Sequence, residues 1–411
     1  MNNVEQLIQN LCPSGVTHKS LGELGKFYGG ITGKSKADFV DGNAIFISYK
    51  NVYSNIALDV NPSDRVKIGP DEKQRTLQYG DVIFTGSSET PDECGMSSVI
   101  TEKTDEELYL NSFCFFFRFN DLSIIEPDFA KHLFRSGNLR YQIGKTASGV
   151  TRFNVSKKLM EKVIIPIPPI DIQREIARIL DEFDSTTNQL IKELTAELVI
   201  RKKQLEHYSE QLLTFDDSIL TDKLINLCKF RNGKGHEKNI DETGRYIVVN
   251  SKFISTQGDV KKYSREQICP LYVDDILMVM SDLPNGRALA KCFVVNENDK
   301  YTLNQRIGAF HVNDESVITT KFLYFVLNRN AQLLKYDNGV DQTNLKKGDI
   351  LNITIPLPSL EEQKRIVSTL EEYSELCDAL SRALQEEIIS RQKQYGFYRD
   401  TLMSFGNANK Q

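Results

Sequence analysis

Hydrophobic side chains recur at steps of three and four residues along two long stretches, from about residue 169 to Phe215 and again up to Phe405. This period places apolar side chains on one face of an α-helix, so each stretch predicts a long amphipathic helix. The prolines of residues 165–169 prevent an earlier start but suit a first helical turn. About 45 residues at 1.5 Å each make a helix of roughly 65 to 70 Å.

Both apolar stripes have the near-heptad spacing of a coiled coil, with one extra four-residue step. The extra step falls at Leu194 to Leu198 in the first helix and at Leu384 to Ile388 in the second. Each stripe needs a partner, and the segment between the helices is long enough for the chain to fold back. We therefore expect an antiparallel pair, with a globular half at each end. The alternative is that each helix packs on its own globular half.

Residues 165–215 recur without a gap as residues 355–405, 190 positions later. The identical pairs include Ile165/Ile355, Pro166/Pro356, Pro168/Pro358, Gln173/Gln363, Ile176/Ile366, Leu180/Leu370, Arg201/Arg391, Tyr208/Tyr398 and Phe215/Phe405. Such self-similarity indicates an internal repeat, in which one globular unit and one helix occur twice in the chain. Ser359 and Glu362 predict a capping box for the second helix, whereas Pro169 replaces the serine in the first.

The two globular segments contain short β-branched and aromatic runs between glycine-rich or polar turns, which predict strands. These runs are residues 44–48, 81–86, 112–119, 245–250, 275–280 and 291–295. Amphipathic stretches at Glu126–Phe134 and Thr319–Leu327 predict short helices. The expected fold is mixed α+β (α/β), with two similar globular domains separated by two long antiparallel coiled-coil helices and internal pseudo-twofold symmetry. The predicted segments are residues 1–164, 165–215, 216–354 and 355–411.

Composition limits the function classes. The 411 residues have a net charge of −5, so nucleic-acid binding would have to rest on local basic loops. No apolar run approaches the roughly 18 to 20 residues of a membrane span, and the amino terminus lacks the order of a secretory signal, which favours a cytoplasmic protein with no membrane contact. The seven cysteines form no C-x-x-C pair and are expected to be reduced thiols.

A composite motif occurs twice: a G-x-x-x-x-N-[LV] loop, then I-P-[IL]-P about ten residues later, then Q-[RK]-x-I. It spans residues 148–176 and 338–366, and LCPSGVTHKSLGEL stands at residues 11–24. On these motifs the chain resembles the specificity (S) subunits of type I restriction-modification systems over nearly its whole length.

The resemblance implies two target recognition domains, at residues 1–164 and 216–354, each reading one half of a bipartite double-stranded DNA site. It implies that the conserved helical regions, residues 165–215 and 355–411, set the half-site spacing and bind two methyltransferase (M) subunits, and that restriction (R) subunits join. It also implies no catalytic centre and no cofactor in this chain, since S-adenosylmethionine, ATP and Mg²⁺ would belong to the partner subunits.

Candidate DNA-contacting residues are polar or basic side chains on loops, because base edges and phosphates are read by such groups. In the first half they are Lys34, Lys36, Lys73, Gln74, Arg75, Ser87, Thr151, Arg152 and Asn154. In the second they are Arg231, Lys234, Lys238, Lys261, Lys262, Arg265, Arg287, Gln342, Thr343 and Asn344. The repeated Asn154 and Asn344 fit shared architecture or phosphate positioning, and residues that differ between the halves fit base choice.

Catalytic motifs are weak. Residues 28–35, YGGITGKS, differ from a phosphate-binding loop because Tyr28 stands where glycine is required. The five histidines occur singly, and no N-P-P-[YF] sequence typical of adenine methyltransferases is present. No catalytic or metal-binding residue is predicted. Two other functions stay open: a self-contained nucleotide-dependent or DNA-modifying enzyme, and a coiled-coil structural oligomer.

Overall fold

The structure is a computed structural model that describes residues 6, 10–236, 238–283, 288–337 and 339–405. The chain divides into two compact units. Unit 1 comprises Met1–Thr195 and Leu384–Gln411, and unit 2 comprises Ala196–Ala383. The repeat makes the two units alike, and each is built from one globular part and segments of two long helices.

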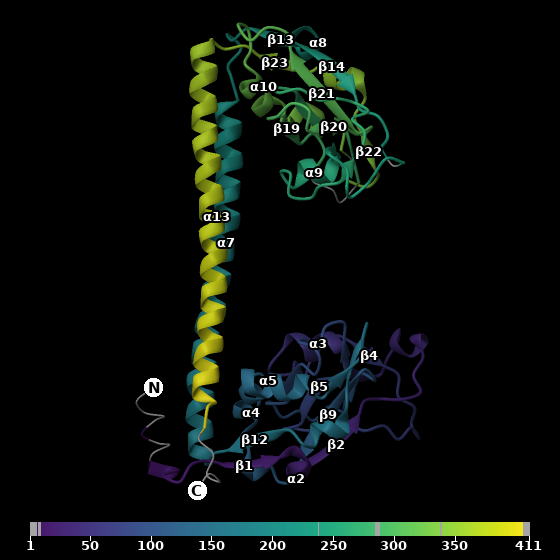
Figure 1. The fold of residues 1–411 in the computed structure, drawn as a ribbon, viewed down its shortest axis with the longest axis vertical. Helices are drawn as coiled ribbons and strands as arrows, with labels where there is room; N and C mark the ends of the chain where they lie inside the picture. The colour runs from purple at the N-terminus through teal and green to yellow at the C-terminus, as the bar shows by residue number, and fades with distance from the viewer. Residues whose placement is uncertain (1–5, 7–9, 237, 284–287, 338, 406–411) are drawn as a thin grey trace. The chain divides into compact units, whose positions relative to one another are not determined.

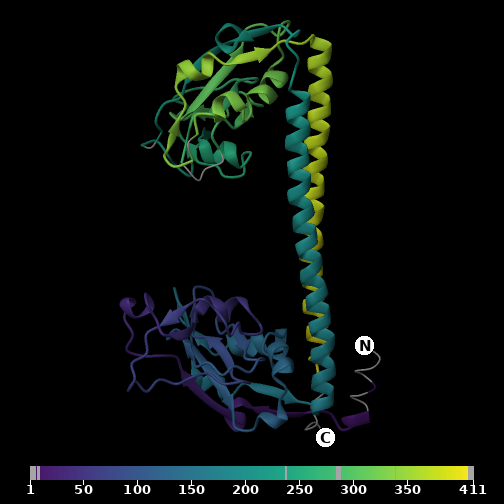
Figure 2. The ribbon, with the colours of Figure 1, turned by 180° about the vertical axis from the view of Figure 1, so that it is seen from behind.

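The two long helices are α7 (Ile170–Leu212) and α13 (Leu360–Leu402), and each has 43 residues. Both begin at the same position of the repeat and extend into both units. In unit 1 the first part of α7 lies beside the last part of α13, and the two run in opposite directions (Figures 1 and 2). In unit 2 the last part of α7 lies beside the first part of α13. The predicted antiparallel helix pair is confirmed, while the placement of the globular halves at opposite ends of a rod stays a prediction.

Aromatic contacts show that the predicted stripes form the helix interface within each unit. In unit 1 the rings of Phe183 and Tyr398 lie 5.4 Å apart. In unit 2 the rings of Tyr373 and Tyr208, which occupy the equivalent positions of the repeat, lie 5.7 Å apart. The first turns of each helix instead pack on the globular part that precedes them, because Ile172 and Ile176 belong to the core of unit 1 and Ile366 to that of unit 2. Each of the two packing alternatives therefore holds for part of the helix.

Gln173, in the first turn of α7, is buried and ties the helix to the globular part. Its amide oxygen accepts a hydrogen bond from the Glu126 backbone N–H at 2.8 Å. Its amide nitrogen donates to the carbonyls of Ile124 and Pro168 at 2.9 and 2.7 Å. Gln363 makes the same three contacts at the start of α13, with Thr319 N–H, Val317 C=O and Pro358 C=O. A buried amide with all three partners explains why the glutamine recurs.

The capping box predicted for α13 is only half formed. The Ser359 hydroxyl accepts from the Glu362 backbone N–H at 3.3 Å. The Glu362 carboxylate receives hydrogen bonds from Arg365 instead of turning back to Ser359. At the start of α7, the carbonyl of Pro169 accepts from Ile172 and Gln173. The proline therefore directly precedes the helix, and both helices begin at equivalent residues.

Unit 1 contains a four-stranded antiparallel sheet in the order β2-β9-β5-β7 and a three-stranded sheet in the order β4-β3-β8. The strands are β2 (Gly25–Gly29), β9 (Cys114–Phe119), β5 (Val82–Thr85), β7 (Ser97–Val99), β4 (Arg65–Val66), β3 (Ala44–Ile47) and β8 (Leu108–Leu110). Strand β1 (Thr17–Ser20) pairs with β12 (Ile164–Ile167) beside α7. The helices are α2 (Leu21–Leu24), α3 (Tyr49–Ser54), α4 (Pro127–Leu133), α5 (Gly137–Gly144) and α6 (Lys157–Met160), with η1 (Lys36–Phe39) and η2 (Leu122–Ile124).

Unit 2 repeats this topology, with sheets in the orders β14-β21-β17-β19 and β16-β15-β20. The strands are β14 (Cys228–Asn232), β21 (Ile307–Val312), β17 (Ile276–Val279), β19 (Cys292–Val294), β16 (Tyr263–Ser264), β15 (Tyr246–Val249) and β20 (Tyr301–Leu303). Strand β13 (Thr221–Lys223) pairs with β23 (Thr354–Pro356). The helices are α8 (Leu224–Leu227), α9 (Ser251–Ser255), α10 (Thr320–Leu327), α11 (Ala331–Leu334) and α12 (Lys347–Leu351). The predicted strands and short helices are confirmed, and the predicted segment boundaries stay a prediction.

Candidate nucleic-acid interface

A short ladder of strands stands at one end of the main sheet in each unit. In unit 1, β6 (Ser87–Ser88) pairs with β11 (Phe153–Val155), which also forms a hairpin with β10 (Ala147–Ser148). In unit 2, β18 (Ser281–Asp282) pairs with β22 (Thr343–Asn344). The register is the same in both, because Asn154 lies opposite Ser87 and Asn344 lies opposite Ser281. Figure 1 labels β22 at the edge of unit 2.

The loop that leads into each ladder needs glycine. Gly149 has a φ of 155°, and a Cβ there would lie 2.0 Å from the carbonyl oxygen of Arg152. Any side chain at this position would force the hairpin open. Gly339 occupies the same place in unit 2 and has a φ of 67°, which favours glycine although nothing crowds it. The glycine of the repeated G-x-x-x-x-N motif is therefore a backbone requirement.

Arg152 lies at the start of the unit 1 ladder and is held in place by a serine. Its Nε and Nη2 donate to the Ser87 hydroxyl oxygen at 3.2 and 3.0 Å. Ser87 is only 6% exposed, so the oxygen is a fixed acceptor. The guanidinium also lies 5.5 Å from the ring of Phe113, which is 57% exposed. One edge of the guanidinium is thus fixed by Ser87, and Arg152 as a residue is exposed.

Gln342 occupies the position of Arg152 in unit 2 and makes the equivalent contact. Its Nε2 donates to the Ser281 hydroxyl at 2.8 Å, and Ser281 is also 6% exposed. A second, longer contact runs from Nε2 to Asn344 Oδ1 at 3.5 Å. The two units therefore share the serine and the backbone ladder but present different side chains from it.

Two further lysines flank the ladders, and the sequence analysis did not select them as candidates. Lys157 begins α6 with its ammonium 5.7 Å from the Phe115 ring, and Lys347 begins α12 with its ammonium 5.4 Å from the Phe230 ring. They are equivalent in the repeat and both are exposed. The 190-residue offset that matched Asn154 with Asn344 could have found them, since each lysine follows its asparagine by three residues.

Unit 2 also has a cation where unit 1 has an aromatic ring. The Phe113 carbonyl accepts from Gly86 N–H at 2.7 Å, and the Arg306 carbonyl accepts from Met280 N–H at 3.0 Å. These matching bonds place exposed Arg306 in the position of Phe113. The matching Leu110-Asn111 and Leu303-Asn304 pairs, which lie shortly before these two positions, could have revealed this equivalence.

The predicted cations of the loop 32–75 are partly used inside unit 1. Lys34 forms an ion pair with Glu72 at 2.5 Å and is 10% exposed. Gln74 joins the same group, because it bonds the backbone of Thr32 and the Glu72 carboxylate. Hydrogen bonds from Lys34 and Gln74 lower the pKa of Glu72 to about 2. This group shapes the loop, so Lys34 and Gln74 have partners inside unit 1.

The remaining predicted cations of unit 1 are more accessible. The Arg75 guanidinium stacks 4.5 Å from the ring centre of Tyr28, and Lys36 and Lys73 are exposed. Thr151 is exposed beside Arg152, and Asn154 contacts the Arg152 carbonyl at 3.5 Å. Ser87, Thr151, Arg152 and Asn154 therefore form one group, which we call the unit 1 ladder site.

Arg231 is bound to a buried carboxylate in unit 2. It donates to Asp275, to which His311 Nδ1 also lies at 3.1 Å, and to the Pro270 carbonyl at 3.0 Å. In unit 1 the equivalent buried aspartate, Asp81, is paired with Arg118 of β9 at 2.6 Å. Burial raises the pKa of Asp81 despite this partner. Asp81 and Asp275 are thus equivalent buried aspartates that pair with arginines from different strands, β9 in unit 1 and β14 in unit 2. Arg231 therefore has a partner inside unit 2.

The other predicted residues of unit 2 lie on its surface. Arg265 pairs with Asp241 at 2.5 Å. Lys234, Lys238, Lys261 and Lys262 are exposed. Thr343 contacts Asp337 at 3.4 Å and lies in the ladder with Gln342 and Asn344. Arg287 lies outside the described residues.

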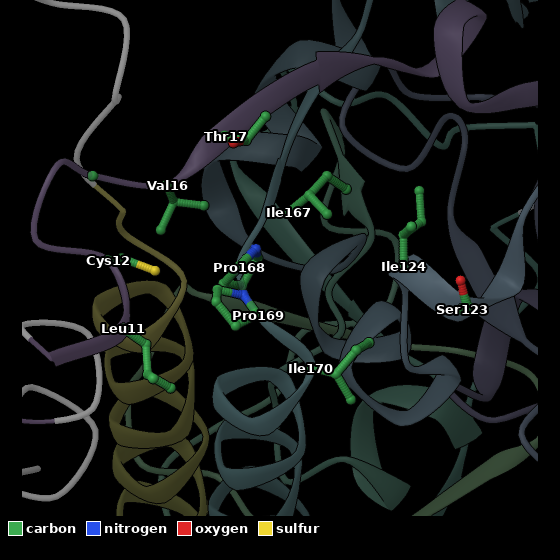
Figure 3. Close-up of a pocket in the computed structure, with 11 residues that line it drawn as sticks. Leu11, Cys12, Val16, Thr17, Ser123, Ile124, Ile167, Pro168, Pro169 and Ile170 are labelled. Atoms are coloured by element: carbon green, nitrogen blue, oxygen red, sulfur yellow. The ribbon is translucent and has the colours of Figure 1, made fainter.

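A hollow of about 430 Å³ lies in unit 1 where α7 begins (Figure 3). It is lined by parts of the segments 11–17, 123–124 and 167–170. The labelled side chains are mainly aliphatic or proline, and none of the lining residues is charged. The hollow therefore lacks the positive groups that a phosphate or nucleotide requires, and the ladder sites are the better candidates.

Two observations concern only the described part of the chain. No cluster there of three or more histidine, cysteine, aspartate or glutamate side chains could hold a metal ion. No helix there is long and apolar enough to cross a membrane.

Comparison with known proteins now places the chain in a family. A family described as type I restriction modification DNA specificity domain matches residues 13–199 and again 221–390. The two matches cover most of the sequence and correspond to the two copies of the repeat. The chain therefore belongs to the family of type I restriction-modification specificity subunits.

Individual relatives agree with this assignment. A type I restriction enzyme specificity subunit of Escherichia coli is 29% identical over 61% of this chain, and the match spans 65% of that protein, just under two thirds of its length. A putative type I restriction enzyme specificity subunit of Haemophilus influenzae is 28% identical over 63% of this chain and 68% of its own.

Solved structures show that the fold is shared. A chain from a study of assembly and conformational transition in a type I R-M system has a TM-score of 0.69 at 18% identity, covering 95% of this chain and 97% of that one. The HsdS subunit of Thermoanaerobacter tengcongensis has a TM-score of 0.54 at 18% identity, covering 96% of this chain and 97% of its own.

Proposed function

We propose that this chain is the DNA-reading subunit of a type I restriction-modification complex and that each unit contacts one half of a bipartite double-stranded site. The observation that carries the proposal is the pair of ladder sites. Both have the same register, a positive-φ glycine at the same repeat position and an equivalent buried serine, but they present Arg152 in one unit and Gln342 in the other. Such a pair suits two readers that share a scaffold and differ in the bases that they select.

Electrostatics supports the ladder sites as the contacts. The chain has a net charge of −5, so its average surface repels a polyanion. Lys157 and Lys347 flank the two ladders in equivalent positions, and both are exposed. In the proposal these lysines contact phosphates and position the chain, while the side chains that differ select bases.

The helices have two roles in the proposal. Helices α7 and α13 each continue unbroken from one unit into the other, so they are suited to set the separation of the half-sites. The repeated helical surfaces also offer equivalent binding sites to two copies of a methyltransferase (M) subunit. Restriction (R) subunits would join this assembly in the cytoplasm, where chromosomal DNA is accessible.

The chain contributes recognition without chemistry in this proposal. Methyl transfer from S-adenosylmethionine and ATP- and Mg²⁺-dependent cutting would belong to the partner subunits. Incubation of the isolated chain with S-adenosylmethionine or ATP should then give no turnover. Light scattering with and without DNA and M subunits would distinguish the reader from a structural oligomer.

Co-expression with the methyltransferase of the same system, followed by genome-wide mapping of methylated adenine, tests the proposal. The expected result is a single motif with two specified parts separated by unspecified bases. A continuous motif, or methylation that does not depend on this chain, would contradict it.

A further inference from the structure

We infer that Arg152 reads a guanine in the half-site of unit 1 and that Gln342 reads an adenine in the half-site of unit 2. This inference rests on the proposed function and assigns it a pair of specificity-determining residues. Ser87 and Ser281 act as positioning residues, because each fixes its neighbour through one buried hydroxyl oxygen.

The hydrogen-bonding capacity of Arg152 supports the guanine assignment. A guanidinium has five N–H groups, and Ser87 takes one from Nε and one from Nη2. Within the described residues, no acceptor is bonded to Nη1. The outer edge, with Nη1 and the second Nη2 hydrogen, therefore stays available as a two-pronged donor. Guanine presents two acceptors, O6 and N7, side by side in the major groove, which is the arrangement that such an edge matches.

Gln342 can both donate and accept a hydrogen bond, and adenine requires this combination. Its Nε2 donates to Ser281 at 2.8 Å and reaches Asn344 only at 3.5 Å. Its amide oxygen receives no hydrogen bond from the described residues. The side chain can therefore accept one hydrogen bond and donate one, which matches N6–H and N7 of adenine.

The shared ladder makes the two positions comparable. Both side chains leave the backbone two residues before the repeated asparagine, and both contact a serine at the same register of the partner strand. The serine and the strand register are therefore shared, and the side chain at this position is the difference that should change the base read. Phe113 in unit 1 adds an aromatic surface beside the guanidinium, which limits its movement before DNA arrives.

The test uses the full chain in complex with its methyltransferase. Arg152→Gln should change the preferred base at one position of one half-site from guanine to adenine, with the other half-site unchanged. Gln342→Arg should make the reverse change in the other half-site. In each case the ratio of methylation rates for the two bases should change by about ten- to a hundredfold. Ser87→Ala should reduce that ratio several-fold while the preferred base stays guanine.

Arg65→Gln is a matched control, because the Arg65 side chain is exposed and, among the described residues, donates to the nearby carbonyls of Pro62 and Asp64. It should leave the motif unchanged. Unmodified protein on DNA with 7-deazaguanine or 7-deazaadenine at the assigned positions gives a second test that needs no folded variant. Each analogue lacks N7, and methylation should slow by about tenfold or more.

The outcomes separate the inference from the proposed function. A bipartite motif whose bases do not change with Arg152→Gln or Gln342→Arg would overturn the inference and leave the function in place. Insensitivity to both N7 analogues at every guanine and adenine of the motif would overturn it as well, even where a variant fails to assemble. Loss of the bipartite motif in the unmodified complex would overturn the function itself.

Discussion

The junction between globular part and helix pair is built differently in the two units. Unit 1 buries His132, whose Nε2 lies 2.7 Å from Asp181 of α7 and whose Nδ1 lies 2.9 Å from the Tyr395 hydroxyl of α13. Unit 2 buries Phe322 at the same repeat position, packed edge-on against Phe215. One junction depends on directional hydrogen bonds, and the other on apolar contact.

A neighbouring ion pair is the same in both units, which makes the contrast informative. Lys131 lies 2.9 Å from Asp181 in unit 1, and Lys321 lies 2.7 Å from Glu371 in unit 2. Tyr395 has Leu205 as its counterpart, so a helix end carrying Leu205 could not satisfy His132. The polar contact therefore distinguishes the two helix ends that the repeat would otherwise make alike, a use of buried polar groups known from coiled coils.

Phe322→His should have the largest effect, because it puts the histidine of unit 1 into the junction of unit 2. Leu205 stands at the position of the Tyr395 hydroxyl, so lost packing and a ring nitrogen without this partner should destabilise unit 2 by about 3 kcal/mol or more. Urea unfolding of the chain would measure this. Adding Leu205→Tyr and Glu371→Asp should recover part of the loss by rebuilding the unit 1 contacts. Equal unfolding midpoints for Phe322→His and the unmodified chain would contradict the account.

Gln173→Ala and Gln363→Ala test the feature that the units share. Each change leaves a buried N–H and two carbonyls without a partner, so each should lower the free energy of unfolding by about 2 to 4 kcal/mol. The two losses should agree within about 1 kcal/mol, since the contacts match. Gln189→Ala on the exposed surface of α7 is the control and should change little. A large effect in only one unit would show that the junctions are not equivalent.

Asp181→Asn should change how the free energy of unfolding depends on pH. Burial raises the pKa of Asp181, but the hydrogen bonds and charges of His132 and Lys131 outweigh burial and leave the pKa below its usual value. A carboxyl with a lowered pKa stabilises the fold fully above its unfolded pKa of about 4 and loses this contribution as pH falls through its folded pKa.

At pH 7, Asp181→Asn should lower the free energy of unfolding by about 1 kcal/mol. The loss is small because the carboxylate is 41% exposed and partly screened by solvent. Thermal unfolding from pH 7 to pH 3 should show this difference shrinking below about pH 4. Glu371→Gln is the counterpart in unit 2, with one lysine partner and no histidine, and should cost less. If the stability difference between Asp181→Asn and the unmodified chain grew as pH fell, the lowered pKa of Asp181 would be contradicted.

Lys157→Ala and Lys347→Ala should have the smallest effects, and equal ones. Each removes one proposed phosphate contact, so DNA binding by the complex should weaken a few-fold for every sequence, and the slope of log affinity against log salt should fall by about 1. Lys103→Ala is a control on a loop away from the ladder. A change in base preference for either lysine variant would contradict a positioning role.

The sequence predicted the long helices and six of the strands because their evidence is local. The three- and four-residue steps of α7 and α13 and the aromatic run of β9 lie within single segments. Long-range polar partners were not predictable in this way. Lys34 and Glu72 are 38 positions apart, and His132 and Tyr395 are 263 apart. Which cations are free to meet DNA depends on such pairs, and no periodicity encodes them.

The repeat was the most useful guide to the candidate site. It identified Asn154 and Asn344 as equivalent and, extended by three residues, would have identified Lys157 and Lys347. It could not show that Arg152 and Gln342 contact equivalent serines, because Ser87 and Ser281 are 194 positions apart and not 190. Inserted or deleted loop residues shift the numbering, and only the strand register recovers the match.

The central claim is that the two units read two different half-sites from equivalent ladder sites. Hydrogen–deuterium exchange of the chain with its methyltransferase tests it directly, on DNA that carries both half-sites, only one, or neither. With one half-site intact, the ladder of one unit should be protected more than the other, and the second DNA should reverse the pattern. Equal protection of both ladders by either single half-site, or protection of neither by the complete site, would contradict the account.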